Sequence, residues 1–367
     1  MRIKLSALPY IFLFALVVRI IAVLGERLVG MGVFFHPDSY YYIETARGLF
    51  DRSFDEILLV AIYNEFYVFL VSLILSVVNA PEAVVMVNII IGAAVPALIY
   101  AILARAGTSN RTAIVAGIYF SLLPYHVHLS ANILKDSLFL LFSLKALYDF
   151  ERKNFTSFFI FSLLTIANRL YLGAVFIAFI PITRRLGKLS LGRGLLMMMF
   201  VIGTLSFISA DGVIDRRNIE FEGRDFFPGL QVATPDSKIG VVAYALFSPI
   251  KNLFSPNLLQ ARSVTDLLFG LNILAYQLLI IFVMFKLWSQ HRTRLFFHKT
   301  VSTNDALANF GRQLIYLYVA VVTFSDLVTP AVGPLVRYRE LGFILLAIAM
   351  FVTLDLKPKR PEIALTK

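Results

Sequence analysis

The sequence contains no cysteine and has few charged residues for its size. Its 367 residues include no Cys, and only 16% are charged. The absence of Cys excludes disulfides, thiolate metal sites and a cysteine nucleophile. Any catalytic or binding group must therefore be a carboxylate, a hydroxyl, Lys, Arg or one of five His residues. The shortage of charge, with 59% hydrophobic residues and a mean hydropathy of +0.78, excludes an ordinary soluble globular domain. The sequence therefore predicts a polytopic membrane protein.

The sequence also lacks the motifs of nucleotide and zinc enzymes. It has no Gly-rich phosphate loop, no H-E-x-x-H and no D-x-D in the first polar loop. The net charge of +11 does not indicate a nucleic-acid partner, because the basic residues gather in short turns between apolar runs, as the positive-inside rule predicts for cytoplasmic turns. These turns are Arg105/Arg111, Glu151-Arg152-Lys153, Arg184-Arg185/Lys188, His291-Arg292/Arg294 and the Lys357-Pro358-Lys359-Arg360 tail.

Apolar runs long enough for helical spans or half-spans recur along the whole chain, which predicts an all-α bundle of about 10 transmembrane helices. The first run is expected to be a retained anchor with a cytoplasmic amino terminus, because it is long and has no small-residue cleavage signal. The runs are Leu5–Val29, Ile62–Asn79, Ala83–Ala104, Ala113–Leu129, Ser137–Phe150, Phe155–Ile182, Leu195–Ser209, Leu267–Trp288, Leu314–Val328 and Leu341–Leu354.

Two of these runs do not read as simple crossings. With Asp38 outside and Arg105 inside, the two runs between them cannot both cross, and we expect Ile62–Asn79 to be a juxtamembrane or re-entrant helix because its start is polar. Phe155–Ile182 is too long for one upright helix and has Arg169 at its middle. A hairpin of two short spans would place this guanidinium at the outer tip rather than in hydrocarbon, where it would be costly.

The segment His36–Tyr42 is predicted to be an acidic, tyrosine-rich loop directly after the first span. Asp38 is the leading candidate for a general base, because a hydrophobic surface raises a carboxyl pKa and the neighbouring rings, Tyr41 among them, can orient a sugar. The alternative is a turn or helix start, since Pro-Asp-Ser is also a good helix-start signal. The sequence leaves both interpretations open.

Further polar groups are expected on the same outer face. Asp136 could orient an acceptor or fix a cation near Asp38, and Lys135 could meet a phosphate, although a carboxylate in a first helical turn is stabilised by the helix dipole without any chemistry. Arg suits a phosphodiester because its planar fork stays charged, but Arg and Tyr also anchor helices at the membrane interface. The candidates for binding substrate are Tyr41, Glu65, Lys135, Arg169, Arg337, Tyr338 and Arg339.

A bound metal is not predicted. His126 and His128 are two residues apart, which on a helix points them to different sides. No cofactor is expected, and dependence on a divalent metal stays open.

The order of these features resembles the membrane-embedded glycosyltransferases of the GT-C class, especially the protein-mannosyltransferase and aminoarabinose-transferase-like superfamily. Asp38 with Tyr41 and Ala46 resembles that family's first-loop acid and its downstream aromatic residue. Glu65-Phe66-Tyr67 resembles the start of its next apolar segment. The remaining similarity lies in the series from Val84 through Arg105, Pro124 and Ser130 to Asp136, and in Arg337-Tyr338.

The resemblance implies transfer of a sugar from a polyprenyl-phosphate donor to a glycan, lipid or protein acceptor on the extracytoplasmic side, with inversion. It carries the roles of first and second acid onto Asp38 and Asp136, which we take as the catalytic pair. Ser39 stands where many members have another acid, which weakens the case for a metal. The implied setting is the cytoplasmic (inner) membrane and cell-envelope polysaccharide biosynthesis, with both termini cytoplasmic and membrane lipids as partners.

On this interpretation residues 1–210 form the catalytic transmembrane module with a first outer loop at 30–61. Residues 211–264 form a second extracytoplasmic loop, 265–356 the last transmembrane helices and 357–367 a basic cytoplasmic tail. Two alternatives stay open. A polysaccharide polymerase or ligase that joins lipid-linked glycans would use the arginines of the second loop, and a lipid-linked sugar flippase would be expected to have two related halves, which we do not find.

Overall fold

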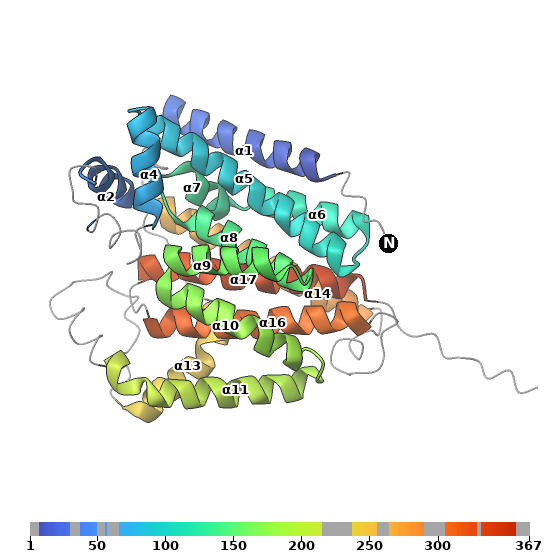
Figure 1. Cartoon of the computed structure of the whole chain (residues 1–367). Helices are drawn as coiled ribbons and strands as arrows, with labels where there is room; N and C mark the ends of the chain where they lie inside the picture. The colour runs from blue at the N-terminus through green and yellow to red at the C-terminus, as the bar shows by residue number, and fades with distance from the viewer. Residues whose placement is uncertain are drawn as a thin grey trace, which may run out of the picture. The chain divides into compact units, whose positions relative to one another are not determined.

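The computed structural model describes residues 7–29, 37–49, 56, 66–214, 237–254, 264–289, 305–328 and 332–356. Within these ranges all regular structure is helical (Figure 1), which confirms the all-α prediction. The helices are α1 (Leu8–Val29), α2 (Pro37–Arg47), α4 (Phe66–Val77), α5 (Pro81–Ala106), α6 (Asn110–Leu122), α7 (Pro124–Ala131), α8 (Asp136–Glu151), α9 (Phe155–Asn168), α10 (Leu170–Leu186), α11 (Leu191–Ile208), α13 (Lys238–Asn252), α14 (Val264–Ser289), α16 (Asp305–Val328) and α17 (Val332–Leu354).

The chain divides into two compact units, which we describe separately. Unit 1 comprises Met1–Arg105, Ala113–Ala178 and Phe254–Ala275. Unit 2 comprises Ala106–Thr112, Phe179–Leu253 and Tyr276–Lys367. Helices α10 and α14 each contribute residues to both units.

The chain is a multi-pass membrane protein by the length and composition of its helices. Among the described residues five helices are long and apolar enough to cross a bilayer, or six if α6 and α7 together form one bent span. This is fewer than the ten that the apolar runs suggested, partly because α4 and α9 have only 12 and 14 residues. A helix of that length extends about 20 Å, whereas the hydrocarbon core is about 30 Å thick.

Helices α1 and α5 run antiparallel in unit 1. The guanidinium of Arg27, near the end of α1, lies 3.5 Å from the carboxylate of Glu82 at the start of α5. Further along, the Nε atom of Arg19 lies 3.1 Å from the position of a Cβ atom built on Gly92. The end of α1 is therefore beside the start of α5, and Arg105 lies at the opposite end of α5.

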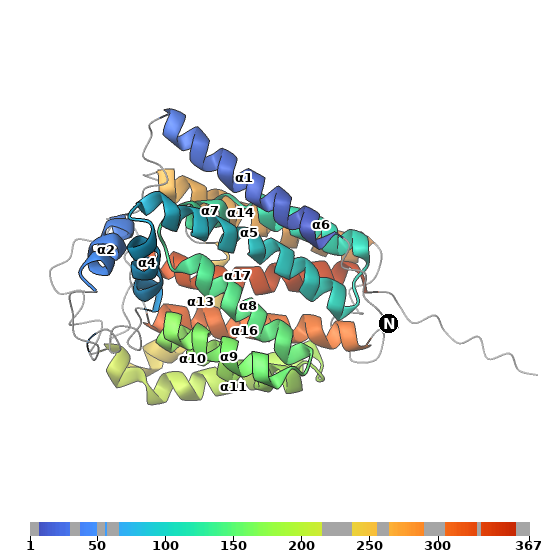
Figure 2. The same cartoon turned by 45° about the horizontal axis from the view of Figure 1, so that its top comes forward.

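Helix α4 lies across the end of α5 rather than along it (Figures 1 and 2). Tyr67, in its first turn, meets Asn88 of α5, and the amide Nδ2 of Asn88 donates a hydrogen bond to the Tyr67 hydroxyl at 2.7 Å. The short length and this orientation agree with the expectation that Ile62–Asn79 is not a complete crossing. Its depth in the bilayer stays a prediction.

Two of the apolar runs each form two helices in the structure. The run Ala113–Leu129 was expected as one helix, but α6 and α7 meet at an angle of 59°. Leu123 has extended backbone geometry before Pro124, because the ring of a proline disfavours the helical conformation of the residue that precedes it. The break predicted in Phe155–Ile182 is confirmed: α9 ends at Asn168 and α10 begins at Leu170, in the opposite direction (Figure 1).

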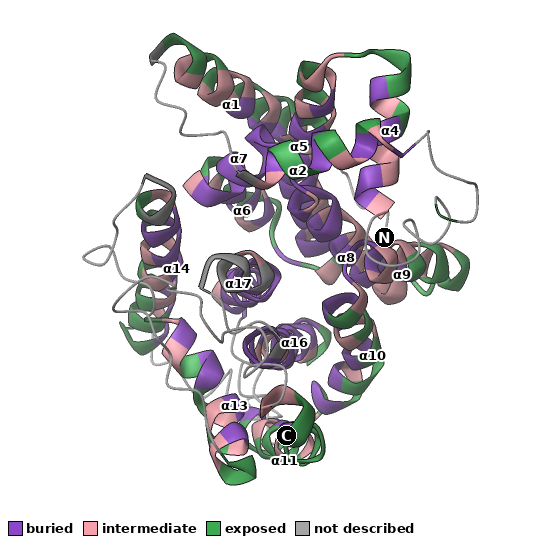
Figure 3. Ribbon diagram, turned by 90° about the vertical axis from the view of Figure 1, so that its left-hand side faces the viewer, coloured by how far each residue is buried: buried purple, intermediate pink, exposed green. Residues whose placement is uncertain are grey.

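In unit 2, α16 and α17 lie side by side and form its most buried part. Figure 3 shows α16 and most of the described part of α17 as largely buried, whereas α11 exposes much of its surface. Residues Arg337–Glu340 were expected to precede the last helix, at Leu341, but α17 already begins at Val332. The helix can include these polar residues because Arg339 and Glu340 have buried partners, which are described below.

Candidate functional site

The acidic segment after the first span is a helix rather than the predicted loop. Helix α2 begins at Pro37, so Asp38 lies in its first turn, where a carboxylate complements the helix dipole. The interpretation of Pro-Asp-Ser as a helix start is thereby confirmed. Asp38 is half-buried, and a general base at this position would be reachable from the surface. His36 lies outside the described residues.

Helix α2 is fixed to unit 1 by polar and aromatic contacts. The Ser39 hydroxyl accepts a hydrogen bond from the backbone N–H of Ile133 at 3.3 Å. The ring of Tyr42, one turn after Asp38, packs edge-on against Tyr67 with centroids 5.1 Å apart. These contacts place the start of α2 beside the segment that joins α7 to α8.

The ring of the predicted substrate residue Tyr41 packs edge-on against that of Tyr42, with centroids 5.6 Å apart. The Tyr41 side chain is 53% exposed, so the ring is available at the surface of α2. Glu65, predicted to act near it, lies outside the described residues. The roles of Tyr41 and Glu65 in binding substrate both stay sequence-based predictions.

The segment 132–135, between α7 and α8, is held by an amide that the sequence analysis did not single out. The Nδ2 atom of Asn88 lies 2.6 Å from the backbone oxygen of Asn132 and 3.2 Å from that of Leu134, besides its contact with Tyr67. Asn88 is 1% exposed. A lone amide in the apolar run Ala83–Ala104 was the available signal, since polar side chains inside a span are costly unless they have a role.

The second predicted acid forms a buried ion pair. Asp136 is the first residue of α8, and its carboxylate accepts a hydrogen bond from the guanidinium of Arg169 between α9 and α10. The side chains are only 2% and 5% exposed. The Arg169 guanidinium also lies 5.6 Å from the ring centroid of Phe139. Arg169 is therefore paired within the protein, as a charge in a low-dielectric setting must be.

Lys135 lies between these features. Its backbone oxygen accepts a hydrogen bond from the Asn168 amide at 3.4 Å, directly before Arg169. The segment 132–136 is thus a junction where residues of α2, α4, α5 and α9 meet, and we call it the junction segment. It brings together Lys135, Asp136, Arg169 and the start of the helix that carries Asp38.

The late arginines lie on α17 in unit 2. Arg337 is half-buried, and Tyr338 lies on the same helix. Arg339 donates from Nε to Oδ1 of Asp326 at 2.9 Å. Glu340 accepts a hydrogen bond from the Tyr276 hydroxyl at 2.8 Å. No relation between these residues and the junction segment follows from the structure, because they belong to different units.

Asp326 is the polar centre of unit 2, and the sequence analysis missed it. It is 0% exposed and accepts hydrogen bonds from Ser248 and from Asn252 (2.9 Å), both on α13, in addition to Arg339. Lys251 lies 3.7 Å from the same carboxylate. A single carboxylate in the apolar run Leu314–Val328 could have signalled this cluster.

Other polar groups of unit 1 serve packing or have no assigned role. The Arg19 Nε atom donates to the Ser130 hydroxyl at 2.8 Å and Nη1 donates to the backbone oxygen of Ala15 at 3.0 Å, whereas Nη2 is buried without a hydrogen-bond partner among the described residues. His126 and His128 are buried on α7, and the ring of His128 stacks on Tyr125 with centroids 5.9 Å apart. Across the described ranges, no three His, Asp or Glu side chains gather as a metal site.

Comparison with known proteins adds one finding. Residues 79–178 match the family described as dolichyl-phosphate-mannose-protein mannosyltransferase. No curated protein and no solved structure matches the chain. The match includes α5, the junction segment and Arg169, and it confirms the predicted resemblance to membrane glycosyltransferases of the GT-C class in this segment. The arginines Arg216, Arg217 and Arg224, on which the polymerase alternative depended, lie outside the described residues.

Proposed function

We propose, taking residues 79–178 as a glycosyltransferase segment of the GT-C class, that the chain transfers a sugar from a polyprenyl-phosphate donor to an acceptor on the extracytoplasmic side of the inner membrane. The observation that carries this proposal is the family match, because it spans the junction segment together with Asp136 and Arg169. The acceptor is a glycan, lipid or protein with a free hydroxyl.

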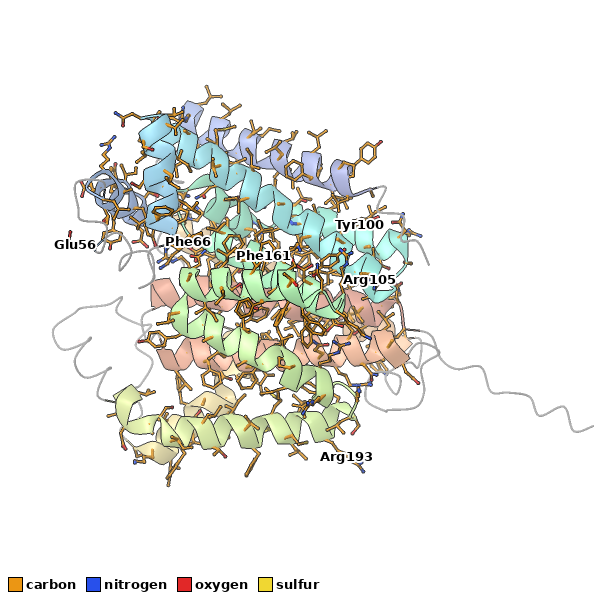
Figure 4. All side chains as sticks on the ribbon, in the orientation of Figure 1. Glu56, Phe66, Tyr100, Arg105, Phe161 and Arg193 are labelled. Atoms are coloured by element: carbon orange, nitrogen blue, oxygen red, sulfur yellow. The ribbon has the colours of Figure 1, made fainter. Side chains whose placement is uncertain are left out.

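The arrangement of unit 1 supports the proposed side of the membrane. Figure 4 shows Phe66, at the start of α4, and Arg105, near the end of α5, at opposite ends of this unit. The 26 residues of α5 extend about 39 Å, enough to cross the hydrocarbon core. If the basic turn after α5 is cytoplasmic, as the positive-inside rule predicts, then Asp38 and the junction segment face outward.

Asp38 is the proposed general base. It removes the proton of the acceptor hydroxyl as that oxygen attacks the anomeric carbon of the donor, and the carrier phosphate leaves from the opposite face with its bonding electrons. This single displacement inverts the anomeric centre. The half-buried position of Asp38 and the exposure of Tyr41 on the same helix are compatible with an acceptor that approaches from water.

Asp136 is proposed to act through Arg169 as a positioning residue. A carboxylate that holds a guanidinium fixes both its place and its orientation. Arg169 and Lys135 then provide positive charge close to the junction segment, where we place the leaving phosphate. This proposal makes Asp136 the residue that fixes a cation, one of the two roles expected from the sequence.

The late arginines are proposed to assist with the donor. On the family resemblance alone, Arg337 is proposed to contact the carrier phosphate, with Tyr338 beside it in sequence. Arg339 is bound by Asp326, and we assign it the task of holding α17 so that Arg337 is presented correctly. Glu65 is proposed as an acceptor-binding residue on the family resemblance alone, and we propose that the reaction needs no metal.

The test is Asp38→Asn in purified protein, reconstituted in lipid and supplied with polyprenyl-phosphate mannose. The asparagine keeps the shape and removes the base, so transfer should fall about 10²- to 10⁴-fold. Glu44→Gln, an exposed carboxylate on the same helix, is the matched control and should keep its activity. Unchanged transfer by Asp38→Asn would remove Asp38 from the mechanism.

A further inference from the structure

A cavity opens beside the junction segment, outside the residues assigned a role above. It has a volume of about 110 Å³ and lies among the end of α1, the start of α2, the start of α5 and the beginning of the junction segment. A water molecule needs about 10–15 Å³ by the same kind of measure, so the cavity holds several groups of that size. Its lining includes Val23, Glu26, Arg27, Ser39, Glu82, Val85 and Asn132.

The lining of the cavity is largely apolar, but it includes two buried polar side chains. Ser39 is 1% exposed and Asn132 is 2% exposed. Ser39 follows Asp38 directly, and its hydroxyl already accepts from the N–H of Ile133. A serine hydroxyl can donate as well as accept, so its own proton remains suited to a hydroxyl oxygen of a ligand. A ligand in this cavity would touch the elements that carry both predicted acids.

Among the described residues that line the cavity, its rim carries more negative than positive charge. Glu26 and Glu82 supply two carboxylates, and Arg27 supplies one guanidinium. Arg27 and Glu82 lie 3.5 Å apart, so that they largely neutralise each other. Glu26 leaves a net charge of about −1 at the rim, which disfavours an anion such as a phosphate. Carboxylate oxygens accept hydrogen bonds from hydroxyl groups.

We propose that this cavity is a binding subsite for the uncharged, hydroxyl-bearing part of the acceptor, and that it discriminates against phosphorylated groups. The description as an acceptor subsite depends on the function proposed above, whereas binding of a neutral polyol does not. The donor phosphate is then confined to the side of Lys135 and Arg169, and the acceptor enters from the side of α1. The anionic donor and the uncharged part of the acceptor thus reach the junction segment from different directions.

The absence of cysteine makes a direct binding test available. In a Val85→Cys variant, labelled by a neutral maleimide in detergent, methyl mannoside should protect the thiol and mannose 6-phosphate should protect it much less. Tyr40→Cys, which replaces a side chain 59% exposed on α2, is the control and should be protected by neither sugar. Equal or stronger protection by mannose 6-phosphate, or no protection by methyl mannoside, would overturn the subsite.

The charge of the rim is tested with two thiol reagents of similar size. The cationic reagent is trimethylammonioethyl methanethiosulfonate, and the anionic reagent is sulfonatoethyl methanethiosulfonate. After each labelling rate of Val85→Cys is divided by that of the Tyr40→Cys control, the cationic reagent should react about tenfold faster than the anionic one, because one unit of negative charge lies close to the thiol. Adding Glu26→Gln should abolish the difference. Faster labelling by the anionic reagent would contradict the proposed selectivity.

A transfer assay connects the cavity to catalysis. Val85→Trp fills the cavity and should raise the KM for an octyl mannoside acceptor about tenfold while leaving the KM for polyprenyl-phosphate mannose unchanged. Leu73→Trp, an exposed apolar position on α4, is the control. An equal rise in both KM values would contradict the acceptor role. If the wild-type protein transfers no sugar, the proposed function fails, and the protection experiment still decides whether the cavity binds a polyol.

Discussion

Each unit contains a buried Asp–Arg ion pair, and the two pairs differ in what surrounds them. In unit 2, Asp326 lies near the end of α16 and binds Arg339 of α17 together with Ser248 and Asn252 of α13. In unit 1, Asp136 is the first residue of α8 and lies at the end of a short segment. The backbone of this segment forms hydrogen bonds with the side chains of Ser39, Asn88 and Asn168. The first pair ties three helices together. The second fixes a junction of chain segments beside the predicted base.

The comparison shows that a buried Asp–Arg ion pair does not by itself identify a functional site. A carboxylate inside a packed interface chiefly compensates the cation that it holds, and removing it leaves an uncompensated buried charge. A pair at the start of a helix, next to a non-helical segment, also controls the position of groups in that segment. We therefore expect substitutions in the unit 2 ion pair to lower mainly the stability of the protein. Substitutions in the unit 1 ion pair should lower both its stability and its catalytic rate.

The largest expected effect is on the stability of unit 2. Asp326→Leu leaves Arg339 buried without its carboxylate and should lower the free energy of unfolding by about 3–5 kcal/mol. Thermal unfolding of the protein in detergent measures this loss. The double variant Asp326→Leu with Arg339→Met removes both charges and should be more stable than Asp326→Leu alone. A double variant less stable than Asp326→Leu alone would contradict this explanation, because it would show that the loss of stability does not come from the unpaired charge of Arg339.

The comparison is sharpened by two acids at opposite ends of α8. Asp136→Asn weakens a hydrogen bond between charged groups and should destabilise by about 1.5–3 kcal/mol. It should also reduce sugar transfer about 10²-fold, because Arg169 loses its orientation. Asp149, 0% exposed and paired with Lys145, is the matched control. Asp149→Asn should lose similar stability yet keep its transfer rate, and equal losses of activity would erase the distinction.

The smallest effect concerns the close packing of α1, α5 and α7. A Cβ atom on Gly92 would lie 2.2 Å from the Cβ atom of Ser130, so Gly92→Ala forces the helices apart and should cost about 1–3 kcal/mol. Gly25, on α1, has nothing within 4 Å of the same position. Gly25→Ala should therefore be neutral or stabilising by up to about 1 kcal/mol. Similar unfolding temperatures for both variants would contradict the packing of unit 1.

Much of the fold could be predicted from local patterns in the sequence. Hydropathy located most of the helices, but not α2 and α13, which lie in the segments 30–61 and 211–264 that were predicted to be loops. The break at Arg169 followed from the length of the run and a charge at its middle. The short helix α4 followed from counting crossings between Asp38 and Arg105. Local signals failed where two readings were equally good: Pro-Asp-Ser began a helix rather than a loop, and Pro124 divided a run that looked continuous.

The pairings within the site could not be predicted in the same way. Asp136 and Arg169 are 33 residues apart, and Asn88 binds a backbone oxygen 44 residues away. Such contacts depend on how helices pack, and no hydropathy period encodes them. The sequence did show which residues were unusual for their surroundings. Arg169 was recognised in this way, whereas Asn88 and Asp326, each a lone polar group in an apolar run, were overlooked.

The most direct test of the account is the side of the membrane that Asp38 faces. In an intact expression host, a membrane-impermeant maleimide should label Tyr40→Cys, two residues after Asp38, from outside. It should label Arg111→Cys, in the first turn of α6, only after the membrane is permeabilised. Labelling of Arg111→Cys in intact cells, with Tyr40→Cys protected until permeabilisation, would place Asp38 in the cytoplasm and contradict the proposed extracytoplasmic transfer.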